Sequence, residues 1–261
     1  MKYYKIIVSE TGKKVKEEKN YMKLMNLYYL KYTNLTSKCG EKNLPQIVCR
    51  TKVYPDYLAL YSQKSTYYKT RNTAVVWFEY DNTIDGRNGL FEAIYFNDEN
   101  TLKKFKERFK NVKFFFTPDY SECGDGIAID NEYRIFKARV VAIWLTTELN
   151  AVVIPTITFP SEDSFKWFLD GLEECSVVGF STKGYMKDEY ELKLLKKAIR
   201  YTVDKLEKLE AIIVYDVCGD YTTALDVFEY AIKKGINVII PPNTLKERNI
   251  KLKEERKNAY K

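Results

Sequence analysis

The chain has 261 residues, of which 45% are hydrophobic and 15% aromatic, and its net charge is +7. This apolar content suffices for the core of one α/β domain spanning residues 1–261. The chain contains no histidine, which excludes a Ser-His-Asp triad, a Cys-His nucleophile and a His-ligated zinc site within it.

The N-terminal part is basic, since residues 1–31 contain eight Lys against three Glu, a charge of +5. Residues 3–8 are apolar enough to predict an edge strand, and residues 13–30 have a helical rhythm. We assign residues 1–43 to a peripheral N-terminal segment.

The next part of the chain predicts strands over residues 44–49 and 74–81, separated by a helix over residues 56–63. Leu102, Phe105 and Phe109 then fall at helical spacing, which predicts a helix that leads into a strand at Val112.

One pattern recurs five times between Val112 and Pro241: a short β-branched apolar run, a polar or proline break, and a helix-period stretch. The predicted strands are residues 112–117, 151–157, 176–181, 211–217 and 236–241. Among the helices between them, Asp130 and Ser161 are predicted to begin two, Asp188 with Glu191 forms a capping-box variant, and Gly235 ends the last.

Alternation of strands with helices that have a single apolar face is typical of an α/β fold whose βα units form a parallel sheet. We predict a TIM-like barrel, complete or incomplete. The alternative is an open, doubly wound sheet.

The C-terminal residues 243–261 hold seven Lys and Arg against three Glu, a charge of +4, which leaves −2 of the total for the body between the two ends. We predict a basic C-terminal tail there, for which solvation is the usual role and nucleic-acid contact the alternative. The five cysteines are odd in number and lack C-x-x-C spacing, as expected for reduced thiols. With no leader and no bilayer-length apolar stretch, we expect a cytoplasmic protein without membrane contact.

Polar residues follow the predicted strands, and the carboxyl ends of parallel strands meet at one rim. We predict catalytic roles there for four residues: Asp81, Asp119, Lys183 and Asp216. We predict substrate contacts for seven more: Tyr120, Arg134, Thr156, Ser181, Thr182, Gly184 and Tyr215. Asp81, Asp119 and Asp216 are also the candidate ligands for Mg²⁺ or Mn²⁺, which oxygen atoms bind.

A structural reading competes at each position, because Thr117-Pro118-Asp119 is also an ordinary turn with Pro at its second position. The chain has neither a G-x-x-x-x-G-K-[ST] loop nor a G-x-G-x-x-G loop after a strand. Residues 123–126 and 181–184 remain as short Gly-containing loops whose backbone amides could bind phosphate.

Several short motifs occur in a fixed order. They are Thr117-Pro118-Asp119-Tyr120-Ser121, Tyr133-Arg134, Val153-Ile154-Pro155-Thr156, Ser164-Phe165 with Asp170-Gly171, and Val178-Gly179-Phe180-Ser181-Thr182-Lys183-Gly184. Over about residues 74–217 this set resembles an uncharacterised domain-of-unknown-function family of bacteria, phages and mobile elements. The resemblance implies a phage or mobile-element background and no particular activity. Tyr215-Asp216 departs from the Tyr-Gly usual in such relatives.

Two classes of function fit these observations. The first is an enzyme that acts through carboxylates on a nucleotide, a nucleic acid or another anionic substrate. The second is a protein that sequesters a nucleic acid, a nucleotide or a host protein without catalysis. The fold alone does not separate them.

Overall fold

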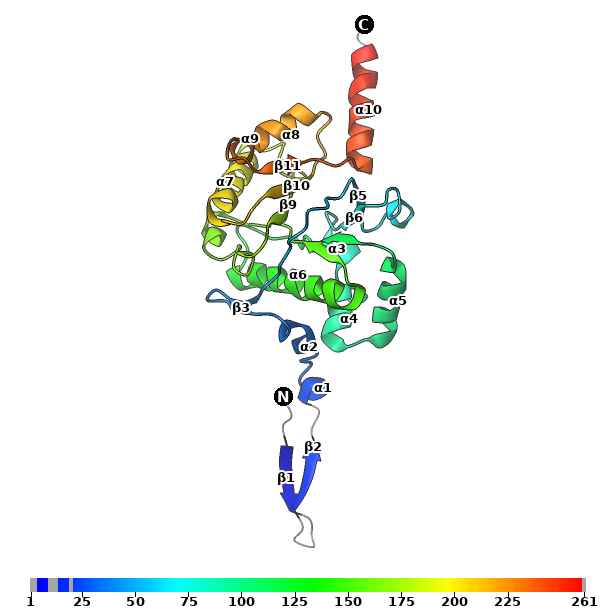
Figure 1. Ribbon diagram of the computed structural model, residues 1–261, viewed down its shortest axis with the longest axis vertical. Helices are drawn as coiled ribbons and strands as arrows, with labels where there is room; N and C mark the ends of the chain where they lie inside the picture. The colour runs from blue at the N-terminus through cyan, green and yellow to red at the C-terminus, as the bar shows by residue number, and fades with distance from the viewer. Residues whose placement is uncertain (1–3, 9–13, 19–20, 260–261) are drawn as a thin grey trace.

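The computed structural model describes residues 4–8, 14–18 and 21–259 (Figure 1). At the N-terminus, β1 (Tyr4–Val8) pairs antiparallel with β2 (Lys14–Glu18), followed by α1 (Tyr21–Leu24) and α2 (Leu30–Thr33). The strand predicted at residues 3–8 is confirmed for its described part. The helix predicted over residues 13–30 is wrong where β2 lies, because this segment satisfies its backbone groups in the ladder with β1.

The parallel strands form two sheets. One has the order β5 (Tyr57–Leu60), β6 (Thr73–Val76), β7 (Phe114–Phe116), β8 (Val152–Ile154). The other has the order β9 (Val177–Ser181), β10 (Ala211–Tyr215), β11 (Asn237–Ile239). All neighbours within them are parallel. The α/β class, and a strand within each of the five repeated apolar runs, are confirmed.

Before residue 73, the predicted helix over residues 56–63 is wrong, and the predicted strand over residues 44–49 is right only for its first two residues. Residues 57–60 form strand β5, not a helix, because all four side chains are buried; a fully buried parallel strand is a continuous apolar run without alternation. Residues 44–49 contribute only β4 (Leu44–Pro45), which pairs antiparallel with β3 (Lys38–Cys39), outside both parallel sheets.

Hydrogen bonds join the two parallel sheets at both of their outer edges. Beyond β8, Thr156 forms a parallel bridge with Gly179 of β9, and the Ile157 amide donates to the Gly179 carbonyl at 2.8 Å. At the other edge the Leu58 amide of β5 donates to the carbonyl of Pro242, beyond β11, at 3.0 Å.

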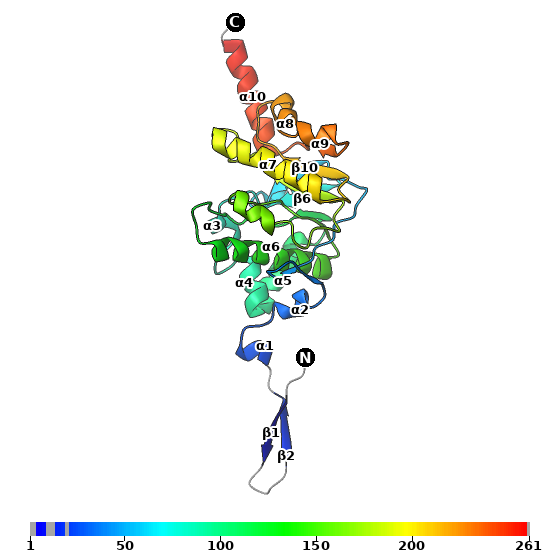
Figure 2. The same ribbon diagram turned by 90° about the vertical axis from the view of Figure 1, so that its left-hand side faces the viewer.

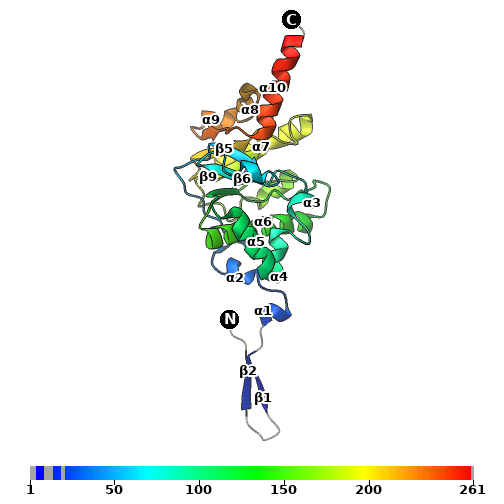
Figure 3. The same cartoon turned by 90° about the vertical axis from the view of Figure 1, so that its right-hand side faces the viewer.

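Helices lie on both sides of the strands: α4, α5 and α6 on one, and α7, α8 and α9 on the other (Figure 1, Figure 2 and Figure 3). The helices after α2 are η1 (Lys64–Thr66), α3 (Asp81–Ile84), α4 (Leu90–Phe96), α5 (Glu99–Phe109), α6 (Ala128–Leu149), η2 (Glu162–Lys166), α7 (Glu189–Lys205), α8 (Tyr221–Val227), α9 (Glu229–Lys233) and α10 (Thr244–Ala259). No described helix is both long enough and apolar enough to cross a lipid bilayer.

The predicted helix boundaries hold in part. Asp188 caps α7 by accepting from the amides of residues 190 and 191, and Gly235, with φ of +82°, follows α9. Asp130 does not cap α6, which begins one turn earlier with Ile127 as its N-cap; its carboxylate binds Arg134 at 2.8 Å. Ser161 precedes only the short η2, because the apolar residues after it pack by ring contacts instead of extending a helix.

Helix α10 begins in the protein body and then projects from it (Figure 1 and Figure 3). Lys246 is 1% exposed and forms a buried ion pair with Asp216 beyond β10. The Asn249 side chain donates to the Val217 carbonyl at 2.7 Å, and Lys253 pairs with Asp220. The segment expected to be a basic tail therefore begins with a docked stretch that ends at Lys253.

Candidate functional site

Asp119 lies in the loop that follows β7 and is partly buried. Burial raises the pKa of its carboxyl to about 7; Lys183 opposes this shift and Asp81 adds to it. Among the described residues its carboxyl has no hydrogen-bond partner, and Lys183 is the cation that opposes the effect of burial. Its protonated form is therefore stabilised relative to that of an exposed aspartate.

Glu122 lies in the same loop, three residues later. Burial raises the pKa of its carboxyl to about 8, partly offset by a hydrogen bond from Thr158 of 2.7 Å, and Asp119 raises it further. Its second oxygen is buried without a partner among the described residues. Sequence reasoning missed Glu122, and the only available signal was a second carboxylate in the strand-end loop that carries Asp119.

Asp81, at the start of α3, fixes the loop after β7. Its carboxylate accepts from the amide and hydroxyl of Ser121, each at 2.9 Å, and pairs with Arg134 at 2.5 Å. Arg134 also binds Asp130, so two carboxylates neutralise its charge. Asp81 and Arg134 were predicted as a catalytic and a substrate-binding residue. In the structure their ion pair joins α3 to α6, and Asp81 holds the loop of Asp119 and Glu122 through Ser121.

Lys183 follows β9 and donates to the Phe78 carbonyl beyond β6 at 2.6 Å. It forms no ion pair within the described part of the chain, and it is the cation that acts on Asp119. The Ser181 hydroxyl accepts from the Lys183 amide at 3.0 Å, and Gly184, at φ of +96°, allows the turn that follows. Ser181 and Gly184 therefore shape the backbone that carries Lys183.

Asp216 has partners other than these residues. It is fully buried, accepts from the Thr182 hydroxyl at 2.7 Å and pairs with Lys246 of α10. Its carboxylate and the Thr182 hydroxyl are thus engaged in docking α10. Among the described residues no three carboxylates or thiols lie close enough together to hold a metal ion, so Asp81, Asp119 and Asp216 do not form a joint metal site there.

Of the remaining predicted residues, Thr156 is partly buried, and Tyr120 and Tyr215 are buried. Thr156 bonds Thr117 twice, at 2.8 and 2.9 Å, and ties β8 to β7. The Tyr120 ring is buried beneath the Lys137 ammonium, 4.3 Å from the ring centre. Tyr215 is buried and stacks on Phe78 with ring centres 4.7 Å apart.

The geometry thus brings together Asp119 and Glu122, with Lys183 as the nearby cation. Burial raises the pKa of the Tyr185 hydroxyl, and the charges of both carboxyls raise it further. A carboxyl that titrates near pH 7 can accept a proton, and one that remains protonated can donate one. The arrangement can therefore perform acid–base chemistry beside a fixed positive charge.

Comparison with known proteins agrees with the motif pattern. Residues 38–231, which include Asp119, Glu122 and Lys183, match the family model described as "Domain of unknown function (DUF4417)". The chain is also similar to the "Gene 1 protein" of Mycobacterium phage L5, at 25% identity over 158 residues, which are 60% of this chain and 64% of that protein. It thus spans less than two thirds of that relative's length. The resemblance to an uncharacterised, phage-associated family is confirmed: the chain belongs to the family of unknown function DUF4417.

Proposed function

We propose that the two parallel sheets are parts of one incomplete TIM-like barrel. Three observations support it. The strand order follows the sequence throughout, whereas a doubly wound sheet reverses its order at a switch point. Hydrogen bonds link both outer edges, at Gly179 and at Pro242. Phe78, beyond β6, stacks on Tyr215 of β10 although these strands belong to different sheets.

Barrel enzymes carry their chemistry on the loops that follow the strands. We propose that this protein is an enzyme that uses Asp119 and Glu122 as an acid–base pair on an anionic small molecule. Asp119 acts as the base, Glu122 as the acid, and Lys183 neutralises negative charge on the substrate. The observation that carries this proposal is the raised pKa of two neighbouring carboxyl groups, about 7 and about 8, in one strand-end loop.

The test is an activity screen on nucleotides and phosphate esters with the wild type and three variants. Asp119→Asn and Glu122→Gln remove the two carboxyl groups at constant size. Asp125→Asn is the matched control, because Asp125 is an exposed residue of the same loop. An activity of this site disappears in the first two variants and survives in the third.

The pH dependence of that activity is a second readout. A base of pKa about 7 and an acid of pKa about 8 give a bell-shaped profile with its maximum between these values. The two limbs belong to the pair jointly, because the groups interact. If every activity found survives Asp119→Asn, the proposal is wrong.

A non-catalytic binding protein is the alternative, and a metal site at the same carboxyls is another. A cation bound between Asp119 and Glu122 would supply the charge that burial leaves uncompensated. Melting curves with Mg²⁺ or Mn²⁺ test this, because a ligand of the folded state raises its stability by mass action. Stabilisation of the wild type but not of Asp119→Asn would replace the acid–base assignment by a metal site.

A further inference from the structure

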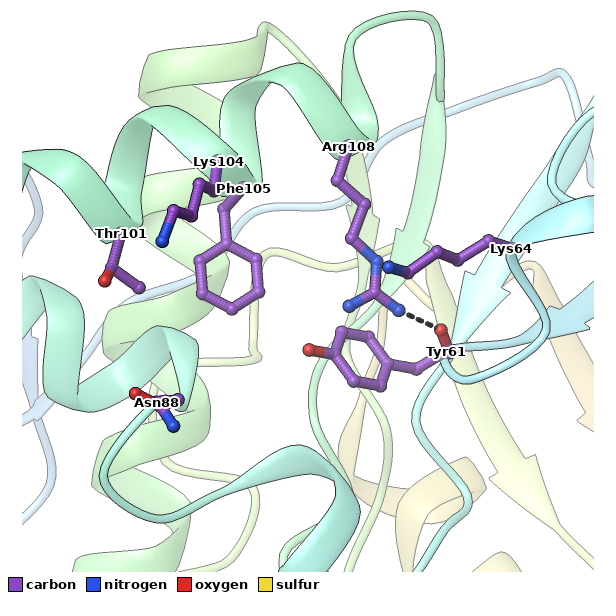
Figure 4. A pocket seen from close by; sticks show the side chains of 7 residues that line it. All are labelled: Tyr61, Lys64, Asn88, Thr101, Lys104, Phe105 and Arg108. Carbon is purple, nitrogen blue, oxygen red and sulfur yellow. Dashed lines mark hydrogen bonds between the residues drawn. The ribbon is translucent and has the colours of Figure 1, made fainter.

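A second site lies apart from the Asp119 loop and shares no residue with it. It is a cavity of about 400 Å³ between α5, the turn after β5 and the loop before α4 (Figure 4). This volume falls within the range of about 300–1,000 Å³ typical of small-molecule sites. The cavity therefore has room for a whole metabolite.

The lining of this cavity is positively charged. Lys64, Lys104 and Arg108 contribute three cations, and no carboxylate lines the cavity. Within the described residues neither lysine forms an ion pair. The nearest capping acid, Asp98, is engaged with the amide and hydroxyl of Thr101, at 3.1 and 2.7 Å. Asp98 interacts with Lys104 only through charge at a distance, without an ion pair, so the cavity presents a net positive charge to a ligand.

Arg108 is held in place before any ligand arrives. Its guanidinium lies 3.8 Å from the ring centre of Tyr61, and one terminal nitrogen donates to the Tyr61 carbonyl (Figure 4). The same nitrogen donates to the Tyr67 hydroxyl at 2.9 Å. The Nε atom of Arg108 is buried without a hydrogen-bond partner, and its second terminal nitrogen, Nη1, makes no hydrogen bond among the described residues either. A fixed guanidinium with a spare donor suits a phosphate group, which accepts hydrogen bonds in a defined geometry.

The cavity also has an apolar wall. The rings of Tyr61 and Phe105 line it beside the cations, and the Asn88 amide lies on the opposite side (Figure 4). We propose that this cavity binds a nucleoside phosphate, with the phosphates on Lys64, Lys104 and Arg108 and the ring system against Phe105. The site is separate from the proposed acid–base pair and does not depend on it.

Isothermal titration calorimetry at low salt tests the proposal, with ATP and inorganic pyrophosphate as probes and adenosine as the uncharged control. ATP is expected to bind more tightly than pyrophosphate, and adenosine weakly. Lys104→Glu should weaken ATP binding by at least about tenfold, because it replaces a positively charged hydrogen-bond donor by a carboxylate that repels the phosphates. Lys103→Glu is the matched control, since it changes the neighbouring exposed residue outside this cavity.

Equal weakening by both substitutions would show general charge attraction and overturn the proposal, as would an absence of ATP and pyrophosphate binding at millimolar concentration. Binding of a single-stranded oligonucleotide that depends on Lys104, without binding of either small probe, would assign the cavity to nucleic acid instead. Asp119→Asn should leave ATP binding at this cavity unchanged, which separates this result from the test of the acid–base pair.

Discussion

The carboxyl groups of Asp119, Glu122 and Glu92 are buried with too little positive charge around them. Burial and Asp85 raise the pKa of Glu92 to about 7, although the Lys137 ammonium lies 4.0 Å away. In the unfolded chain such groups titrate near pH 4. At these three groups the folded protein therefore holds more protons than the unfolded chain between about pH 4 and pH 8.

This difference sets the sign of the pH dependence of stability. A group whose pKa is higher in the folded state stabilises that state fully when the pH is below the pKa of the unfolded chain. This stabilisation is lost as the pH rises through the pKa of the folded state. We predict that these groups make stability fall from about pH 5 to pH 8, with each unit of pKa difference worth about 1.4 kcal/mol. Urea melts across this range measure the slope, and Glu122→Gln should flatten it and stabilise the protein at pH 8. A slope unchanged by the substitution would contradict the assignment.

The buried carboxylate of Asp216 differs from these three groups, because it is paired with the Lys246 ammonium. Lys246→Met leaves the Asp216 carboxylate buried without its cation, which should cost about 3–5 kcal/mol of unfolding free energy. Combining Lys246→Met with Asp216→Asn removes both charges and should recover most of that loss. Denaturant melts of the single and double variants decide it. A double variant as unstable as the single would mean that packing, not charge, is lost.

The sequence predicted that Asp119 and Lys183 each follow a strand, and in the structure they follow β7 and β9. Their functional roles stay predictions. The role of Asp216 could not be predicted, because its partner Lys246 comes from a segment whose composition is that of a solvated basic helix. Glu122 was missed because burial of a loop carboxylate depends on Thr158 and on the packing of the next loop.

The strands and long helices were the most predictable elements. Apolar runs bounded by prolines and polar residues located β7 to β11, and helical spacing located α5, α6 and α7. The prediction of short elements failed where an apolar run fits both a strand and a helix. Strand β5 is such a case, because its four buried residues equally suit one turn of helix. Helix ends depend on which backbone groups find partners, which explains the displaced start of α6.

Gly179 tests the packing between β7 and β9. A Cβ atom at this position would lie 2.3 Å from the Phe116 ring, so Gly179→Ala requires a shift of that ring. We predict a loss of about 1–3 kcal/mol, the usual cost of overpacking. In a Phe116→Leu background the same change should cost less, because the smaller side chain leaves room for the methyl group. Equal costs in both backgrounds, measured by urea melts, would refute the contact.

Two truncations test how α10 is attached. Removal of residues 254–261 leaves every described contact between α10 and the loop after β10, so stability should change by less than about 0.5 kcal/mol. Removal of residues 243–261 also deletes Lys246 and Asn249 and leaves Asp216 buried alone. It should destabilise the whole body. If the shorter truncation weakened binding to duplex DNA and flattened its salt dependence, the projecting part of α10 would be a nucleic-acid contact.

At the scale of the whole molecule, the net charge does not show where positive charge is paired and where it is concentrated. Lys246 and Lys253 supply part of the positive charge at the C-terminus, and both pair with aspartates of the body. The charge of +4 counted over residues 243–261 therefore overstates what this end of the chain offers to a polyanion, because two of its lysines are neutralised by aspartates that lie outside it. The cavity beside Arg108 concentrates three cations in a small volume, and an average over the chain gave no sign of it.

The hydrogen bond between Leu58 and Pro242 has a consequence for synthesis on the ribosome. Each parallel strand after β5 can pair with the strand translated just before it. For β9 this contact is the bridge between Gly179 and Thr156, which follows β8. Assembly can therefore follow translation. The free edge of β5 is different, because its partner emerges almost at the end of the chain. Until then a fully apolar strand edge stays open, which is the usual template for aggregation. A chain that stalls or is cleaved before Pro242 would be marked by that open edge for capture by chaperones or proteases.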